Sequence, residues 1–154
     1  MTSNPGEGPP REFSLLLDDQ LCFALYAASR AVTQRYRPLL ENLGLTYPQY
    51  LVLLVLWEHD TVPVKDIGAA LQLDYGTLTP LVKRLETAGF VRRERDPEDE
   101  RTVRVSLTPH GADLRDRARE IPAAIGAAMA LPDNDFAEAK RILRQLTINV
   151  STRR

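Results

Sequence analysis

The sequence has few cysteines, few histidines and no long apolar run, and each shortage excludes a class of protein. One cysteine among 154 residues rules out an internal disulfide, and the two histidines leave no Cys/His cluster for zinc. The longest apolar run, residues 51–57, is far shorter than the roughly 20 residues that cross a bilayer. The N-terminus lacks the basic and apolar regions of a signal peptide. We therefore expect a cytoplasmic protein with no metal site and no membrane contact.

The sequence also lacks an excess of either charge and lacks the usual catalytic motifs. Lys and Arg number 20 against 21 Asp and Glu, so no overall basic surface predicts nucleic-acid binding. There is no Ser/His/Asp pattern, no glycine-rich phosphate loop and no His-Glu-x-x-His motif. These absences favour a protein that is not an enzyme and carries no cofactor.

What the sequence does contain is helical periodicity. Residues 1–14 are rich in proline and glycine and are expected to form a disordered tail. Beyond them, apolar residues recur at steps of three and four, which predicts a helix that Asp18 or Asp19 caps. Pro38 should kink or end this helix, and Gly44 should stop the segment.

More helices are predicted in the middle of the chain. Residues 46–49 have the capping-box pattern, which predicts a helix to about Glu58, and a short helix is expected over 64–71. After a tight connection, Asp74 should cap another helix, which bends at Pro80. Four apolar positions at helical spacing form the predicted buried face of that helix: Leu78, Leu81, Val82 and Leu85.

The next region predicts a hairpin and two further helices. Residues 103–107 alternate between apolar and polar, which is typical of a half-buried strand. Residues 90–95 should form the partner strand, and the charged stretch 96–101 should form the loop between them. One helix is then expected to run to about Ala130, and a last helix should begin at Pro132.

This order of elements predicts a mostly α fold with a small β wing, in which a winged helix-turn-helix is joined to a helical dimerisation region. We assign residues 46–108 to the DNA-binding domain. A single winged domain does not need the helices at the chain ends for its own core, so residues 15–45 and 109–151 are predicted to hold a homodimer together. Such a dimer should bind a double-stranded operator that carries an inverted repeat.

Candidate DNA-binding residues lie on the outward face of the helix after Asp74 and at the tip of the hairpin. An arginine at the tip suits a minor groove, and Asp99 can hold the guanidinium of Arg101 in position. The alternative is a solvated helix face and a solvated loop, in which opposite charges cancel. The candidates on the helix, which suit base edges or phosphates, are Tyr75, Gly76, Thr77, Thr79, Lys83 and Arg84.

Cys22 is the candidate for redox chemistry. It lies in the first turn of the first predicted helix, where the helix dipole favours a thiolate. Tyr26 and Tyr36 follow on the same stripe of that helix, and phenolic hydroxyls are suitable donors to a thiolate. A lone cysteine is more often a small buried apolar residue, so both interpretations stay open on spacing alone.

Several stretches resemble a known family. The sequence resembles the MarR family of winged-helix regulators over residues 71–86, 89–91, 99–101 and 105–108. Within that family, the organic hydroperoxide resistance regulators of the one-cysteine type are similar over residues 21–30, 36–40, 46–51 and 56–59. Two departures are visible: Tyr75 stands where these regulators often carry serine, and the second cysteine of the two-cysteine branch is missing.

The resemblance implies a dimeric repressor that leaves its operator when an organic hydroperoxide oxidises Cys22. It implies that Tyr36 and Tyr47 are hydrogen-bond partners of the thiol, with Tyr26 nearby. It also implies DNA contacts from the helix over 75–84 and from Asp99 and Arg101.

Two alternatives remain beside this interpretation. The first is a regulator of the same family that responds to a small phenolic or lipophilic ligand, with Cys22 inert. The second is a thiol peroxidase, in which Cys22 is the catalytic nucleophile. With no second cysteine in the chain, a sulfenic acid at Cys22 would condense with a low-molecular-weight thiol or cyclise with a backbone nitrogen.

The spacing of Cys22 and Tyr36 adds a geometric expectation. Fourteen residues on one helix correspond to about 21 Å along its axis, beyond hydrogen-bond reach. The implied contact is consistent with this distance if the first helices of two chains run antiparallel, so that each Cys22 meets Tyr36 of the partner subunit.

Overall fold

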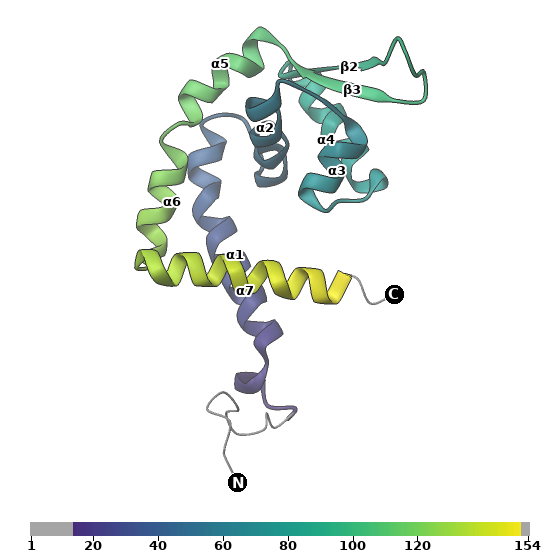
Figure 1. Ribbon diagram of the computed structural model, residues 1–154. Helices are drawn as coiled ribbons and strands as arrows, with labels where there is room; N and C mark the ends of the chain where they lie inside the picture. The colour runs from purple at the N-terminus through teal and green to yellow at the C-terminus, as the bar shows by residue number, and fades with distance from the viewer. Residues whose placement is uncertain (1–13, 152–154) are drawn as a thin grey trace.

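The structure is a computed structural model that describes residues 14–151, so the tail expected at residues 1–14 lies almost wholly outside the described residues. Figure 1 shows a winged unit of helices and a hairpin beside the long helices α1 and α7 and the short helix α6. No helix in the described range is long and apolar enough to cross a membrane. The elements are the 3-10 turn η1 (Leu17–Asp19), α1 (Leu21–Glu41), α2 (Tyr47–His59), β1 (Thr61–Pro63), α3 (Val64–Leu71), α4 (Tyr75–Thr87), β2 (Val91–Arg95), β3 (Val103–Leu107), α5 (Pro109–Ala118), α6 (Ile121–Met129) and α7 (Asp133–Ser151).

The predicted caps within the winged unit are confirmed. The Thr46 hydroxyl accepts a hydrogen bond from the backbone N–H of Gln49, whose side chain accepts one from the Thr46 N–H at 2.9 Å. Asp74 caps α4 by accepting from the N–H of Thr77 at 2.7 Å. The helix α4 includes Pro80 and buries the four predicted apolar residues.

The predicted start of the first helix is wrong. Neither Asp18 nor Asp19 caps α1; both belong to η1, and α1 begins at Leu21 after Gln20, which makes no side-chain cap bond. The carboxylate of Asp19 instead accepts the hydroxyl of Ser14, which ties down the preceding turn. At the other end α1 continues past Pro38 to Glu41, so proline does not end the helix, although it lies in the last turn.

The single helix expected to reach about Ala130 is two helices, α5 and α6. Pro122 explains the interruption, because it has no N–H to donate to the carbonyl of Ala118 and its ring crowds that carbonyl. Arg119 and Glu120 form the junction, and Pro122 lies in the first turn of α6, where a missing N–H costs little. The chain therefore changes direction between α5 and α6 (Figure 1).

The wing is part of a three-stranded antiparallel sheet with the order β1-β3-β2, and β1 was not predicted. Val105 of β3 pairs with Val62 of β1 on one side and with Arg93 of β2 on the other. A three-residue strand that ends in Pro63 resembles a loop in sequence, but an edge strand tolerates a residue without an N–H.

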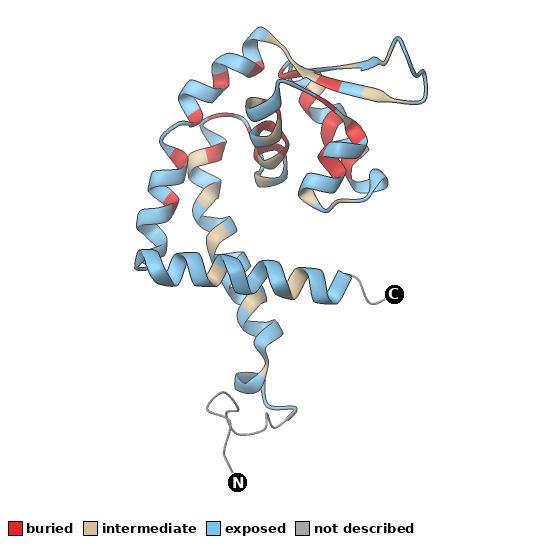
Figure 2. Cartoon of the chain, in the orientation of Figure 1, coloured by how far each residue is buried: buried red, intermediate tan, exposed pale blue. Residues whose placement is uncertain are grey.

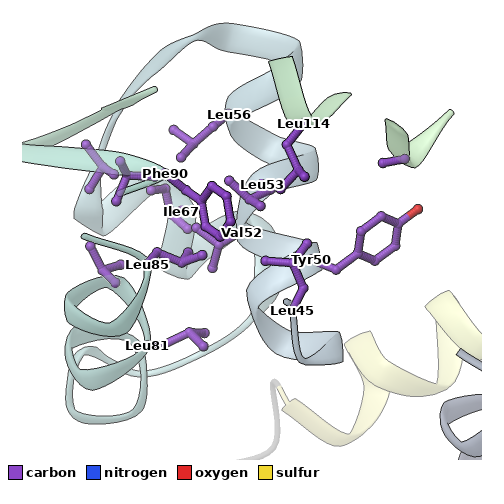
Figure 3. Close-up of a cluster of buried hydrophobic side chains, with 14 of the residues drawn as sticks. Leu45, Tyr50, Val52, Leu53, Leu56, Ile67, Leu81, Leu85, Phe90 and Leu114 are labelled. Carbon is purple, nitrogen blue, oxygen red and sulfur yellow. The ribbon is translucent and has the colours of Figure 1, made fainter. Parts of the chain in front are cut away.

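The apolar core lies mainly inside the winged unit. Side chains from α2, α3, α4 and the sheet meet there, as Figure 3 shows for Leu53, Ile67 and Leu85. The helices α1 and α6 pack against each other, yet most of their surface is exposed, and α7 has no buried residue (Figure 2). The winged unit is thus complete within one chain, whereas the long helices are not.

Candidate redox site and DNA-binding surface

Cys22 is the second residue of α1, and its side chain is exposed. Tyr26 follows one helical turn later, also exposed, with the guanidinium of Arg30 5.5 Å from its ring centroid. The structure therefore places Cys22 and Tyr26 together at one end of α1.

Tyr36 and Tyr47 lie together near the other end of α1. Their ring centroids are 4.7 Å apart. Tyr50, which sequence reasoning missed, joins them at 5.7 Å from Tyr36 and 6.4 Å from Tyr47, and Trp57 packs edge-on against Tyr50 at 6.2 Å. Tyr50 follows Tyr47 by three residues on a capped helix, and that spacing was the signal that could have identified it.

Burial makes these phenols still harder to ionise than a free tyrosine. Desolvation and the neighbouring hydroxyls of Tyr47 and Tyr50 raise the pKa of Tyr36 from 10.0 to about 12. Burial likewise raises the pKa of Tyr47, and burial with the Tyr47 hydroxyl raises that of Tyr50. At neutral pH all three hydroxyls are therefore hydrogen-bond donors that carry no charge.

One protomer does not bring Cys22 to this tyrosine cluster. The helix α1 is continuous from Leu21 to Glu41, so Cys22 and Tyr36 are separated by about 21 Å along its axis. The four predicted redox residues thus form two pairs, Cys22 with Tyr26 and Tyr36 with Tyr47.

A cavity of about 340 Å³ opens beside the tyrosine cluster, between α2 and the α5–α6 pair. Tyr50 is shared by the cavity and the cluster, and Trp57 is fixed by donating from Nε1 to the carbonyl of Gly111 at 2.9 Å. The cavity is lined by Tyr50, Leu54, Trp57, Glu58, Arg115, Ala118, Arg119 and Pro122.

The predicted DNA-binding residues on α4 lie on its outward side. Tyr75, Gly76 and Thr77 in the first turn are exposed, as are Lys83 and Arg84 further along. Thr79 is half-buried and donates its hydroxyl proton to the Tyr75 carbonyl at 2.8 Å, so this hydroxyl is already engaged within the helix.

The expected contact between Asp99 and the guanidinium of Arg101 does not form. Asp99 accepts from the backbone N–H of Arg101 at 3.1 Å and from the hydroxyl of Thr102 at 3.3 Å. A short acidic side chain satisfies nearby backbone donors before it reaches the end of a long arginine side chain. Asp99 thus shapes the turn, and Arg101 forms no ion pair with any residue in the described range.

Other charged residues of the wing are used internally. Arg104 pairs with Asp96 at 2.8 Å across the hairpin, and the guanidinium of Arg95 donates to the Glu100 carbonyl at 3.0 Å. The N–H of Glu98 and the Arg104 guanidinium lower the pKa of Asp96. These contacts stiffen the wing tip on which Arg101 lies.

A further pair links the wing to α4. Glu86 accepts from the backbone N–H, Nε and Nη2 of Arg93 at 3.0–3.2 Å, and these hydrogen bonds lower the pKa of Glu86. Sequence reasoning missed this pair because seven residues and a turn separate its members. It fixes the angle between the recognition helix and the wing.

Within residues 14–151 no cluster of histidine, cysteine or acidic residues could hold a metal ion. The site that remains is a helix-turn-helix with a stiff wing, joined to long helices with an exposed thiol. This arrangement defines a winged-helix DNA-binding regulator.

Comparison with known proteins narrows this class to one family. Residues 45–103 match the MarR family. The chain is 50% identical over 130 residues to the organic hydroperoxide resistance transcriptional regulator of Bacillus subtilis (strain 168), covering 84% of this chain and 88% of that protein. The chain belongs to the MarR family, whose members are DNA-binding transcriptional regulators.

Solved structures agree with this assignment. Reduced AbfR bound to DNA superposes with a TM-score of 0.74 at 39% identity, covering 87% of this chain and 94% of that one. Overoxidised AbfR bound to DNA gives a TM-score of 0.69 at 41% identity, covering 84% and 95%. Another structure identifies AbfR as a protein of Staphylococcus epidermidis. Family membership also sets aside the thiol-peroxidase alternative.

Proposed function

We propose that this chain is a homodimeric repressor that senses organic hydroperoxides by oxidation of Cys22 and then releases its operator. The 50% sequence identity with the organic hydroperoxide resistance regulator of Bacillus subtilis supports an organic hydroperoxide as the oxidant. The exposed thiol supports the choice of sensor, because a peroxide must reach the sulfur. A regulator of transcription works where the DNA is, which supports the cytoplasmic location.

The exposed apolar side chains of the long helices support a homodimer. Leu21 and Phe23 on α1 and Phe136, Ile142 and Ile148 on α7 are each at least 43% exposed. Faces of this kind on helices that share no core of their own are typical of subunit interfaces. In the proposed dimer the α1 helices run antiparallel, so Cys22 of one protomer meets Tyr36 and Tyr47 of the partner subunit.

The unbroken length of α1 is the observation that carries the shared pocket. The thiol lies at one end, its phenolic partners lie at the other, and only a second chain can join them. A hydroperoxide ROOH then transfers its outer oxygen to the Cys22 thiolate, which leaves a sulfenate and the alcohol ROH after protonation. The phenols are donors to the thiolate and to the oxygen that the sulfur gains.

The release of DNA is assigned to the reaction that follows formation of the sulfenic acid. The sulfenic acid condenses with a low-molecular-weight thiol R′SH, which forms a mixed disulfide and releases water. This adduct is bulky and lies between two subunits, so it forces α1 of one protomer away from the tyrosine cluster of the partner subunit and changes the spacing of the two recognition helices, α4 of each protomer. That AbfR binds DNA in an overoxidised form supports adduct bulk, rather than added oxygen, as the trigger.

The proposal is tested by a band-shift with the promoter DNA beside the protein's own gene. The reduced protein should bind, and a stoichiometric amount of an organic hydroperoxide plus a small thiol should abolish binding. The Cys22→Ser protein should bind and ignore the treatment. Mass spectrometry should show the mixed disulfide at Cys22 of the wild-type protein; release without any modification of Cys22 would contradict the proposal.

The cavity beside Tyr50 supports a second candidate, a regulator that responds to a small phenolic or lipophilic ligand. Its volume and aromatic wall suit such a molecule. If a phenol releases DNA from both Cys22→Ser and wild type, and peroxide treatment affects the two proteins alike, this candidate is correct and the redox proposal is not.

A further inference from the structure

The exposed apolar side chains of this protein are distributed unevenly. Among residues 14–151, almost all the large apolar residues that are exposed lie before residue 27 or after residue 128, in the segments assigned to the dimer. The winged unit has two: Leu54, which is 40% exposed and lines the cavity beside Tyr50, and Tyr75, which is 64% exposed. Tyr75 is therefore an aromatic side chain that neither the core nor the dimer helices cover.

The position of Tyr75 indicates which surface would cover it. It is the first residue of α4, the second helix of the helix-turn-helix, and residues in this first turn meet base edges in the major groove. Lys83 and Arg84 are exposed on the same helix and supply positive charge toward DNA. The helix that begins with Tyr75 thus carries positive charge that suits operator DNA as the partner.

The neighbouring Asp74 disfavours a phosphate at this point. Its carboxylate already occupies the N–H of Thr77, and the N–H groups of Thr77 and Gly76 lower its pKa, so it is charged at neutral pH. A phosphate beside Tyr75 would meet this negative charge and would find the N–H groups of Gly76 and Thr77 already engaged. A base edge carries no such charge.

We propose that Tyr75 is a specificity-determining residue that packs its ring on the 5-methyl group of one thymine in each operator half-site. Thymine is the base that presents a methyl group in the major groove, and apolar side chains recognise it by contact. The proposal rests on the proposed operator-binding function and adds a base preference to it.

The test begins with duplexes selected by the full-length reduced protein from a random library. Each thymine of the selected site is then replaced singly by deoxyuridine, which removes only the methyl group. One position in each half-site should lose about three- to fivefold in affinity, as expected for one buried methyl group. Tyr75→Phe keeps the ring and should show the same loss, whereas Tyr75→Ser should bind thymine and deoxyuridine duplexes equally.

The other outcomes are distinct. Equal binding of every deoxyuridine duplex by the wild-type protein, or unchanged discrimination in Tyr75→Ser, overturns the methyl contact. A uniform loss of affinity in Tyr75→Phe together with equal binding of thymine and deoxyuridine duplexes assigns the contact to the hydroxyl and overturns the methyl contact as well. Failure of the wild-type protein to select any duplex, with a normal thermal unfolding curve, refutes the operator-binding function itself.

Discussion

At the scale of single residues, the tyrosine cluster gives this protein an unusual response to alkali. Folding keeps the pKa of Tyr36 at about 12, whereas the unfolded chain ionises this phenol near 10.0. The protonated native form is therefore favoured below pH 10, and this contribution to stability is lost as the pH rises from about 10 to 12. The free energy of urea unfolding should fall across that interval at fixed protein concentration. Tyr36→Phe should fall less steeply, and equal slopes would contradict the assignment.

Arg101 is the residue of the wing tip that its neighbours leave available for DNA. Arg104 and Arg95 are held by contacts inside the hairpin. The carboxylate of Asp99 accepts a hydrogen bond from the backbone N–H of Arg101 and does not pair with its guanidinium. Arg101→Ala should weaken operator binding about tenfold, most strongly where the flanks are rich in A·T pairs. Arg101→Lys keeps the charge but not the planar fork, so its affinity should lie between the two. Wild-type affinity in Arg101→Ala would remove this residue from the interface.

At the scale of elements, the sequence predicts those whose signal is local. Asp74 is of a residue type that caps helices, and the apolar positions that follow it are spaced as a buried face requires, so α4 follows from its own residues. β1 could not be predicted in this way, because Val62 is a strand residue only through its pairing with Val105, more than forty residues later. The break before α6 was predictable in principle from Pro122, but the alanine-rich stretch around it favoured an uninterrupted helix.

The candidate site divides in the same way. Exposure of Thr77 and Lys83 follows from helical periodicity once the buried face of α4 is known. The partners of Asp99 and Glu86 do not follow from helical periodicity, since they depend on the conformation of the hairpin loop and on the position of β2 beside α4. The contact of Tyr50 with Tyr36 depends on the crossing of α1 over α2, which no spacing within either helix specifies, whereas its contact with Tyr47 follows from their spacing on α2.

The junction between the wing and α5 gives a sharp test of packing between elements. A Cβ at Gly111 would lie only 2.0 Å from the backbone carbonyl oxygen of Phe90, an atom that cannot move away without breaking its bond from Thr108. Gly111→Ala should therefore lower the free energy of unfolding by about 3 kcal/mol or more. Gly126→Ala in α6 is the matched control: its Cβ meets nothing within 4 Å, so it should be neutral or add up to about 1 kcal/mol. Urea unfolding at equal protein concentration compares them, and equal effects would contradict this packing.

At the scale of the whole molecule, a mixed dimer distinguishes a shared pocket from a pocket within one chain. One protomer carries Cys22→Ser and the other carries Tyr36→Phe, so the remaining thiol lies on the chain that lacks the Tyr36 hydroxyl. In a shared pocket this thiol meets Tyr36 of the partner subunit, and it should react with an organic hydroperoxide at the wild-type rate. The Tyr36→Phe homodimer should react about tenfold more slowly, because each thiol has lost one donor. Slow reaction of the mixed dimer would place the pocket in a single chain.

The internal ion pairs of the winged unit also limit how strongly ionic strength can weaken its binding to DNA. Residues 46–108 contain eight lysines and arginines against ten acidic residues, so this unit binds a polyanion while carrying a net negative charge. Arg93 and Arg104 are paired with carboxylates, which leaves six cations per protomer and twelve per dimer to displace counterions: Lys65, Lys83, Arg84, Arg92, Arg95 and Arg101. A plot of the logarithm of the association constant against that of the salt concentration should therefore be no steeper than about −11. A steeper slope would mean that the long helices or the chain ends also contact phosphates.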